Sequence, residues 1–174
     1  MTKFRKAEKF DLPRIEALVN SAYRGDYAKK GWTTEAYILD GQRTDQGKLQ
    51  ELILNPGSEI LMALDEETEA IVGCVNIIRE HDALYFGMLT VEPDQQGKGL
   101  GKQLLQQIEK IAQKLGLGKI KMTVIHGRPE LVSYYERFGY RKTGKTEPFP
   151  NDPRYGIPKK ENLFFEEFVK TLSE

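Results

Sequence analysis

The sequence is poor in cysteine and has no long hydrophobic run. Cys74 is the only cysteine among 174 residues, which excludes an internal disulfide and any metal site built from several thiolates. No apolar stretch approaches the ~20 residues that span a bilayer. The N-terminal segment MTKFRKAEKFDL also lacks the apolar core of a signal peptide. We therefore expect a soluble, cytoplasmic protein with no membrane segment and no metal.

An excess of charge of either sign is also missing. Lysine and arginine total 26, and aspartate and glutamate total 26. A chain without net charge gives no electrostatic reason to expect nucleic acid or an anionic membrane as a partner. Hydrophobic residues make up 39% and charged residues 30%, which is ordinary for a globular protein. Length and composition together predict one domain over residues 1–174.

The spacing of hydrophobic residues predicts an α/β fold with a mixed sheet. The strands between residues 59 and 91 should form an antiparallel meander, and the strand–helix–strand unit that follows implies one parallel pair around the long helix. Residues 146–162 contain four prolines and should form an ordered loop or flap. The predicted strands are 2–8, 59–64, 70–78, 84–91, 119–125, 140–145 and 163–170; the predicted helices are 12–22, 33–39, 45–54, a long helix ending at Leu115, and 130–138.

Three glycines, Gly97, Gly99 and Gly101, stand where the long helix should begin. Glycine lets backbone N–H groups approach a ligand, and a helix N-terminus offers unpaired donors at the positive end of its dipole. A phosphate or pyrophosphate would fit there, and Lys98 and Lys102 add positive charge. A flexible turn with a poor cap explains the glycines equally well. The spacing fits poorly to G-x-x-x-x-G-K-[ST] and to the dinucleotide loop G-x-G-x-x-G.

Two motifs together resemble the GNAT superfamily of acyl-CoA-dependent N-acetyltransferases. Residues 96–101, QGKGLG, match the family's Q/R-x-x-G-x-G/A motif between a strand and a helix. Residues 135–140, YERFGY, match its second motif, a tyrosine followed after a short spacer by G-F/Y. The order of elements along residues 2–170 also agrees, so the resemblance covers nearly the whole chain. It implies a single GNAT-type domain that uses acetyl-CoA.

By this resemblance, backbone N–H groups of the glycine motif would hold the pyrophosphate of acetyl-CoA. The strand before the motif would pair with the pantetheine arm, which would lie in a gap between that strand and residues 119–125. Many family members have an asparagine near position 128, where this chain has Arg128. The implied cofactor-binding residues are Leu89, Thr90, Val91, Gln96, Gly97, Lys98, Gly99, Leu100, Gly101 and Lys102.

Acetyl transfer requires a neutral amine that attacks the thioester and a thiolate that leaves. The family commonly protonates that thiolate with a tyrosine, and Tyr135 is the matching position; a purely packing role is the alternative. The base is less clear, because residues 84–89 contain no carboxylate. His126, at the end of a predicted strand, has an imidazole of suitable pKa, although a lone histidine there is more often structural.

The acceptor pocket would be formed by the first helices and the late loop. Their aromatic and charged residues suit a small polar amine that also carries a carboxylate. Arg24 and Arg43 could bind that anion, or be solvated or salt-bridged. Phe149 would line the pocket, and Trp32 would either line it or act as a hydrophobic staple.

We therefore predict an acetyltransferase that acts on a primary amine of a small molecule. Two alternatives stay open: a protein or peptide amine as the acceptor, and an acyl-CoA sensor without turnover. Exposed strands could also pair two copies of the chain into a homodimer.

Overall fold

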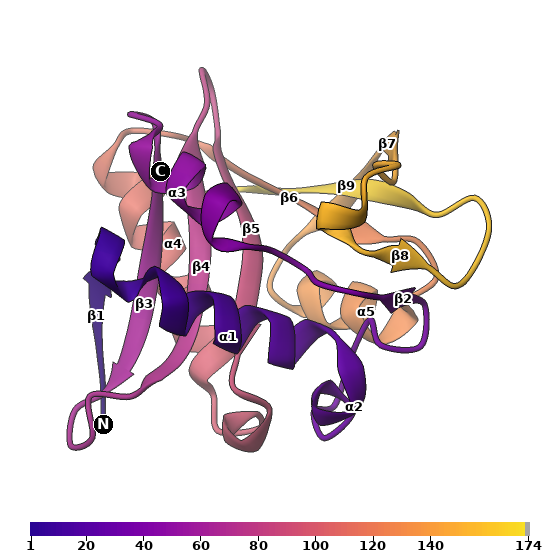
Figure 1. Cartoon of the computed structure of the whole chain (residues 1–174). Helices are drawn as coiled ribbons and strands as arrows, with labels where there is room; N and C mark the ends of the chain where they lie inside the picture. The colour runs from indigo at the N-terminus through magenta and orange to yellow at the C-terminus, as the bar shows by residue number, and fades with distance from the viewer. Residues whose placement is uncertain (173–174) are drawn as a thin grey trace.

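The structure, a computed structural model that describes residues 1–172, is organised around a seven-stranded sheet (Figure 1). The strand order is β1-β3-β4-β5-β6-β9-β7, and a separate two-stranded sheet joins β2 to β8. The strands are β1 (Thr2–Lys6), β2 (Leu39–Asp40), β3 (Ser58–Asp65), β4 (Ile71–Arg79), β5 (Leu84–Val91), β6 (Lys119–Ile125), β7 (Arg141–Pro148), β8 (Ile157–Pro158) and β9 (Phe164–Thr171). The helices are α1 (Leu12–Tyr23), α2 (Gly25–Ala28), α3 (Gln46–Leu54), α4 (Leu100–Lys114) and α5 (Pro129–Arg137).

The predicted mixed sheet is confirmed. Strands β3, β4 and β5 form the expected antiparallel meander. Strands β5 and β6, which precede and follow α4 in the sequence, form the parallel pair. The remaining pairs of the large sheet, β1–β3, β6–β9 and β7–β9, are antiparallel. The fold is therefore α/β with a mostly antiparallel sheet.

The parallel pair opens along its length. Strand β5 pairs with β6 only at Leu84 with Ile120 and at Tyr85 with Lys121, although both strands continue beyond these residues. The register between β4 and β5 also shifts near Met88, whose φ of 58° is left-handed. A bulge of this kind increases the local twist of a strand. The sheet consequently splays between β5 and β6, as the ribbons show (Figure 1).

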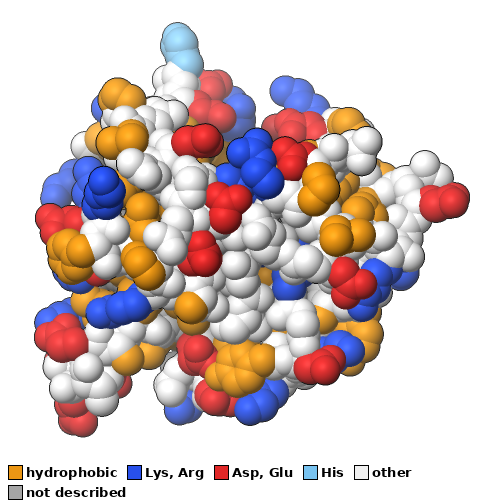
Figure 2. All heavy atoms as spheres, viewed as in Figure 1, with side chains coloured by type: hydrophobic (Ala, Val, Ile, Leu, Met, Phe, Trp, Pro, Cys, Tyr) orange, Lys and Arg blue, Asp and Glu red, His pale blue; other side chains and the backbone are white. Residues whose placement is uncertain are grey.

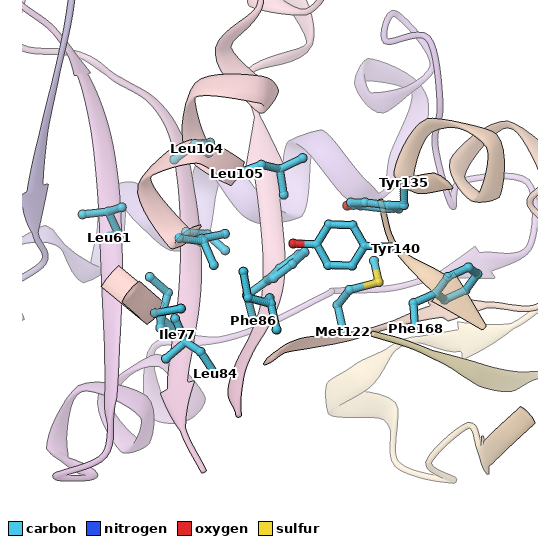
Figure 3. Close-up of a cluster of buried hydrophobic side chains, with 14 of the residues drawn as sticks. Leu61, Ile77, Leu84, Phe86, Leu104, Leu105, Met122, Tyr135, Tyr140 and Phe168 are labelled. Atoms are coloured by element: carbon cyan, nitrogen blue, oxygen red, sulfur yellow. The ribbon is translucent and has the colours of Figure 1, made fainter. Parts of the chain in front are cut away.

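Two hydrophobic clusters hold helices on opposite faces of the sheet. Helices α1 and α3 cover one face through a cluster that includes Ile15 and Leu49. Helix α4 covers the other face through Leu104 and Ile108, in a cluster that continues to Phe86 and to the aromatic residues at α5 (Figure 3).

The predicted helix over residues 33–39 is wrong. Residues 29–38 form turns, and Leu39–Asp40 pairs with Ile157–Pro158. The hydroxyl of Thr33 donates to Glu130 at 3.0 Å instead of capping a helix, and Glu35 binds distant arginines. These tertiary bonds outweigh a short helix, which is marginal by itself.

The other predicted elements are present within a few residues. Residues 146–162 contain the end of β7, a 3₁₀ turn (Pro153–Tyr155) and β8, so they are ordered as expected. The short helix α2 was not predicted. Within residues 1–172, no helix is both long and apolar enough to span a membrane. Positive and negative side chains are interspersed over the face shown in Figure 2.

Candidate active site

The glycine loop leads directly into α4. Gly99 is the N-cap residue of the helix and has a φ of 83°, and Gly97 has a φ of 82°. Glycine adopts these left-handed conformations without the steric cost of a Cβ. A Cβ at either position would meet nothing within 4 Å. The first turn of α4 therefore begins beside open space, with N–H donors that the helix itself does not use.

Gly101 has a different role from the other two glycines. It lies inside the first turn of α4, where a Cβ would come within 2.7 Å of the Tyr134 hydroxyl. Tyr134 belongs to α5, so this glycine lets the two helices approach each other. The Tyr134 ring also contacts the ring of Trp32, with 5.3 Å between the centroids.

Gln96 connects the glycine loop to the turns after α2. Its side-chain Nε2 donates to the carbonyl of Val91 at 3.2 Å, and its Oε1 accepts from the backbone N–H of Trp32 at 2.9 Å. Trp32, expected in the acceptor pocket, thus lies beside the glycine loop and does not line the larger cavity described next. Its side chain is half exposed.

A cavity of about 490 Å³ lies between the splayed strands and the late loop. A second cavity of about 80 Å³ lies against the end of β5 and Gln96. Both are lined in part by the same four residues, so the two cavities are neighbours on either side of one set of side chains. The shared residues are Tyr23, Glu35, Arg128 and Leu131.

Tyr135 lines the larger cavity from α5. Its side chain is packed among Phe86, Tyr134 and Tyr140 and is only 6% exposed (Figure 3). Its hydroxyl makes no hydrogen bond with any residue in 1–172. Burial raises the pKa of the Tyr135 phenol well above 10, so this group is a proton donor at neutral pH.

Tyr23 also reaches the cavity, from the end of α1. Its hydroxyl donates to the carbonyl of Leu89 at 2.7 Å, and burial raises its pKa to about 12. Leu89 belongs to the segment of β5 implied for the pantetheine arm. Sequence reasoning expected residues 21–26 near the acceptor pocket but did not single out Tyr23, because nothing in a helical tyrosine indicates which distant carbonyl it will bind.

Three buried side chains form an ion cluster in the cavity wall. Arg24, Glu35 and Arg128 have side chains that are 4%, 8% and 8% exposed. Arg24 donates to one Glu35 oxygen at 2.9 Å, and Arg128 approaches the other at 3.3 Å. Burial lowers the pKa of Arg24, and the neighbouring Glu35 opposes that shift. The predicted site residue Arg24 is therefore salt-bridged.

Arg43 and Phe149, the other predicted acceptor residues, do line the larger cavity. The Arg43 guanidinium lies 5.3 Å from the centroid of the Tyr23 ring. Phe149 stacks on Phe165 at 5.5 Å between centroids. The structure thus brings Arg24, Arg43, Phe149 and Tyr135 to one cavity.

His126 lies apart from this group. Its Nδ1 is hydrogen-bonded to Glu166, its ring stacks on Phe164 at 4.5 Å, and its side chain is 57% exposed. His126 does not line the cavity. Besides Glu35, the cavity is lined by three carboxylates, those of Glu80, Glu147 and Glu167. In the part of the chain that the structure describes, no group of three or more His, Cys, Asp or Glu side chains is placed to hold a metal.

The fold and the site define an α/β protein with a glycine-rich helix start beside a splayed parallel pair. The family model of the acetyltransferase (GNAT) domain matches residues 24–151. The chain therefore belongs to the GNAT family and is an acetyltransferase.

Solved structures of N-acetyltransferases share this fold. A candidate phosphinothricin N-acetyltransferase is 17% identical, with 100% of each chain covered and a TM-score of 0.70. The ribosomal-protein-S18-alanine N-acetyltransferase of Escherichia coli is 14% identical, with 100% of this chain and 96% of that chain covered and a TM-score of 0.71. A candidate streptothricin acetyltransferase from Bacillus anthracis, solved with acetyl coenzyme A, is 17% identical over 72% of this chain and 68% of that one, with a TM-score of 0.57. No curated protein sequence matches the chain.

Proposed function

We propose that this acetyltransferase moves the acetyl group of acetyl-CoA to a primary amine of a small molecule by direct attack. The observation that carries the proposal is the order of the site: Gln96 and the end of β5 line the smaller cavity, which shares four lining residues with the larger cavity that Tyr135 lines. An acyl donor such as acetyl-CoA, which has a charged pyrophosphate far from its reactive thioester, suits this arrangement.

The loop residues fit the charged end of acetyl-CoA. Open space at the Cβ positions of Gly97 and Gly99 leaves their backbone accessible, and the N-terminus of α4 favours an anion. Backbone groups from Gln96 to Lys102 would hold the pyrophosphate, and Leu89 to Val91 would lie along the pantetheine arm. Two carbonyls of that segment, those of Leu89 and Val91, already accept hydrogen bonds from Tyr23 and Gln96.

Within the larger cavity, Tyr135 would supply the proton that the leaving sulphur takes up. Its buried, protonated hydroxyl makes no hydrogen bond within residues 1–172 that would compete for that proton. For the opposite transfer, we propose that a cavity carboxylate, directly or through water, accepts the amine's proton in place of His126. The carboxylates of Glu80, Glu147 and Glu167 line the cavity, whereas the His126 ring packs against Phe164 outside it.

A small molecule is the favoured acceptor because the larger cavity is partly closed by the late loop. Phe149 and Tyr155 of that loop line it, and its volume of about 490 Å³ lies within the usual range of small-molecule sites. An open groove across the sheet would instead favour a peptide.

The test measures CoA release from acetyl-CoA in the presence of a panel of small amines and N-terminal peptides. The acetylated product is identified by mass spectrometry, and calorimetry measures acetyl-CoA binding separately. We expect binding together with release that a small amine accelerates. If acetyl-CoA binds but no amine accelerates CoA release, the protein is an acyl-CoA sensor. If only peptides accelerate CoA release, the acceptor is a peptide or protein amine.

A further inference from the structure

The arginine side of the larger cavity has an excess of positive charge. Arg24, Arg43 and Arg128 line it, and within the lining Glu35 is the carboxylate that pairs with Arg24 and Arg128. Glu130, outside the lining and 40% exposed, lies 3.6 Å from Arg128. Arg24 and Arg128 are buried and paired, whereas Arg43 is partly buried and has no carboxylate partner within residues 1–172. Three arginines against two carboxylates leave this wall with positive charge, which attracts an anionic ligand.

Arg43 is the cation with the least compensation. No carboxylate in residues 1–172 forms an ion pair with it, and its guanidinium lies over the Tyr23 ring. Its backbone N–H is fixed by the Asn20 side chain at 2.6 Å. Lys48 adds a further cation, because its ammonium donates to the Arg43 carbonyl at 3.3 Å. The loop therefore presents Arg43 to the cavity with its charge unneutralised.

Arg128 belongs to the same wall, and two carboxylates compensate its charge. Its Nη1 and Nη2 bind Glu35 and Thr33, at 3.3 Å and 2.7 Å. Its Nε is buried and makes no hydrogen bond among the described residues, but it forms an ion pair with Glu130 at 3.6 Å. Arg43 is therefore the arginine of this wall that lacks a carboxylate partner within residues 1–172.

From these observations we propose that the acceptor carries a carboxylate beside its primary amine, and that Arg43 binds this carboxylate. The inference rests on the proposed function and narrows its substrate class to amino acids and related amino-carboxylates. In the reaction, the amine nitrogen bonds to the acetyl carbon and the carbon–sulphur bond breaks. The amine loses one proton and the sulphur gains one.

Carboxylates from other elements line the same cavity and would set the orientation of this acceptor. They are Glu80, Glu147 and Glu167, with Glu80 3.6 Å from the Lys121 ammonium and Glu167 accepting from Thr143. An amino-carboxylate can place its anion toward Arg43 and its ammonium toward these carboxylates. A polyamine could meet the same carboxylates but would give Arg43 no anionic partner, so it is the less complementary acceptor.

The experiment compares matched acceptors on the full-length enzyme. Each of the common amino acids is assayed beside its amide and its decarboxylated amine, with CoA release as the rate. We expect at least one amino acid to exceed its amide in kcat/KM by ~10–100-fold, the usual value of a charge-assisted hydrogen bond. Arg43→Gln should remove that preference by raising KM for the amino acid far more than KM for its amide.

Two further variants make the result decisive. Arg14→Gln removes an exposed arginine of α1 outside the cavity and should keep the preference. Arg43→Lys retains the charge and should recover part of it, which separates recognition from folding. If amides or decarboxylated amines are equally good substrates, this inference is overturned while the proposed function stands. If no amine accelerates CoA release, the proposed function itself fails.

Discussion

Tyr135 lines the larger cavity and Tyr140 does not, although their rings pack against each other (Figure 3). The Tyr135 hydroxyl belongs to a cavity-lining residue, whereas the Tyr140 hydroxyl is buried without a hydrogen-bond partner in the described residues. An unsatisfied buried hydroxyl costs free energy that phenylalanine would not. At the residue scale, this pair therefore compares a tyrosine at the cavity with one inside the hydrophobic core.

We expect Tyr140→Phe to leave the free energy of unfolding unchanged or to raise it by up to ~1 kcal/mol. Urea unfolding followed by circular dichroism measures the change. A loss of more than ~1 kcal/mol would mean that the hydroxyl has a stabilising partner after all.

Glu35→Gln should be strongly destabilising. The substitution leaves Arg24 and Arg128 buried without the carboxylate that both contact. Breaking a buried ion pair in this way typically costs ~3–5 kcal/mol of unfolding free energy. Glu130→Gln is the matched control, because that side chain is 40% exposed and should cost less than ~1 kcal/mol. Equal effects of the two changes would refute a special role for the buried cluster.

The residues that sequence could predict are those whose role is local or belongs to a motif. Gly97 and Gly99 adopt left-handed φ at the start of α4, and Tyr135 follows its motif. Glu35 and Arg128 are 93 positions apart and meet only when the chain folds, so no spacing could reveal their contact. The sequence placed Trp32 on the acceptor side, whereas the structure places it beside the glycine loop. Its neighbours there, Gln96 and Tyr134, are distant in sequence, so spacing could not reveal this position either.

At the scale of elements, the start of α4 is constrained in two separate ways. Gly99 needs its left-handed backbone, and Gly101 needs the absence of a Cβ beside Tyr134. The order of the main strands and helices was predictable because hydrophobic periodicity is strong in long elements. The helix expected over residues 33–39 failed because the bonds of Thr33 and Glu35 come from other elements.

These two constraints predict different rescue behaviour. Gly101→Ala should weaken acetyl-CoA binding by displacing Tyr134, and adding Tyr134→Phe should restore it because the obstructing hydroxyl is removed. Gly99→Ala should weaken binding through backbone strain of ~1–2 kcal/mol that Tyr134→Phe cannot relieve. Trp32, the only tryptophan, contacts Tyr134 and provides a fluorescence signal for the titrations.

Gly118→Ala is the control for this set, since a Cβ there meets nothing within 4 Å and its φ is not left-handed. Its affinity for acetyl-CoA should match that of the unmodified enzyme. If Tyr134→Phe rescues Gly99→Ala as well as Gly101→Ala, the proposed distinction between the glycines is wrong.

At the scale of the whole molecule, several buried groups bind protons more tightly in the folded chain than their ordinary pKa values imply. Burial raises the pKa of Cys74 from 9.0 to about 12, and that of Tyr23 from 10.0 to about 12. The associated stability is fully present below pH ~9. It is lost as pH rises toward 12, because the unfolded chain then releases protons that the folded chain retains.

Unfolding free energy should therefore fall between pH 9 and pH 11, by up to ~1.4 kcal/mol per pH unit for each such group. Urea unfolding at several pH values measures this slope. Cys74→Ala removes one of the groups and should give a shallower fall between pH 9 and pH 11. A stability that is constant up to pH 11 would contradict the burial of these groups.

The most direct test of the account is to measure kcat for Tyr135→Phe with an acceptor amine that the enzyme uses. Tyr140→Phe is the control, because it also removes one buried tyrosine hydroxyl. If Tyr135 protonates the leaving thiolate, Tyr135→Phe lowers kcat by ~100-fold or more, acetyl-CoA affinity stays nearly constant, and Tyr140→Phe keeps the original kcat. A Tyr135→Phe enzyme with undiminished kcat would contradict the account.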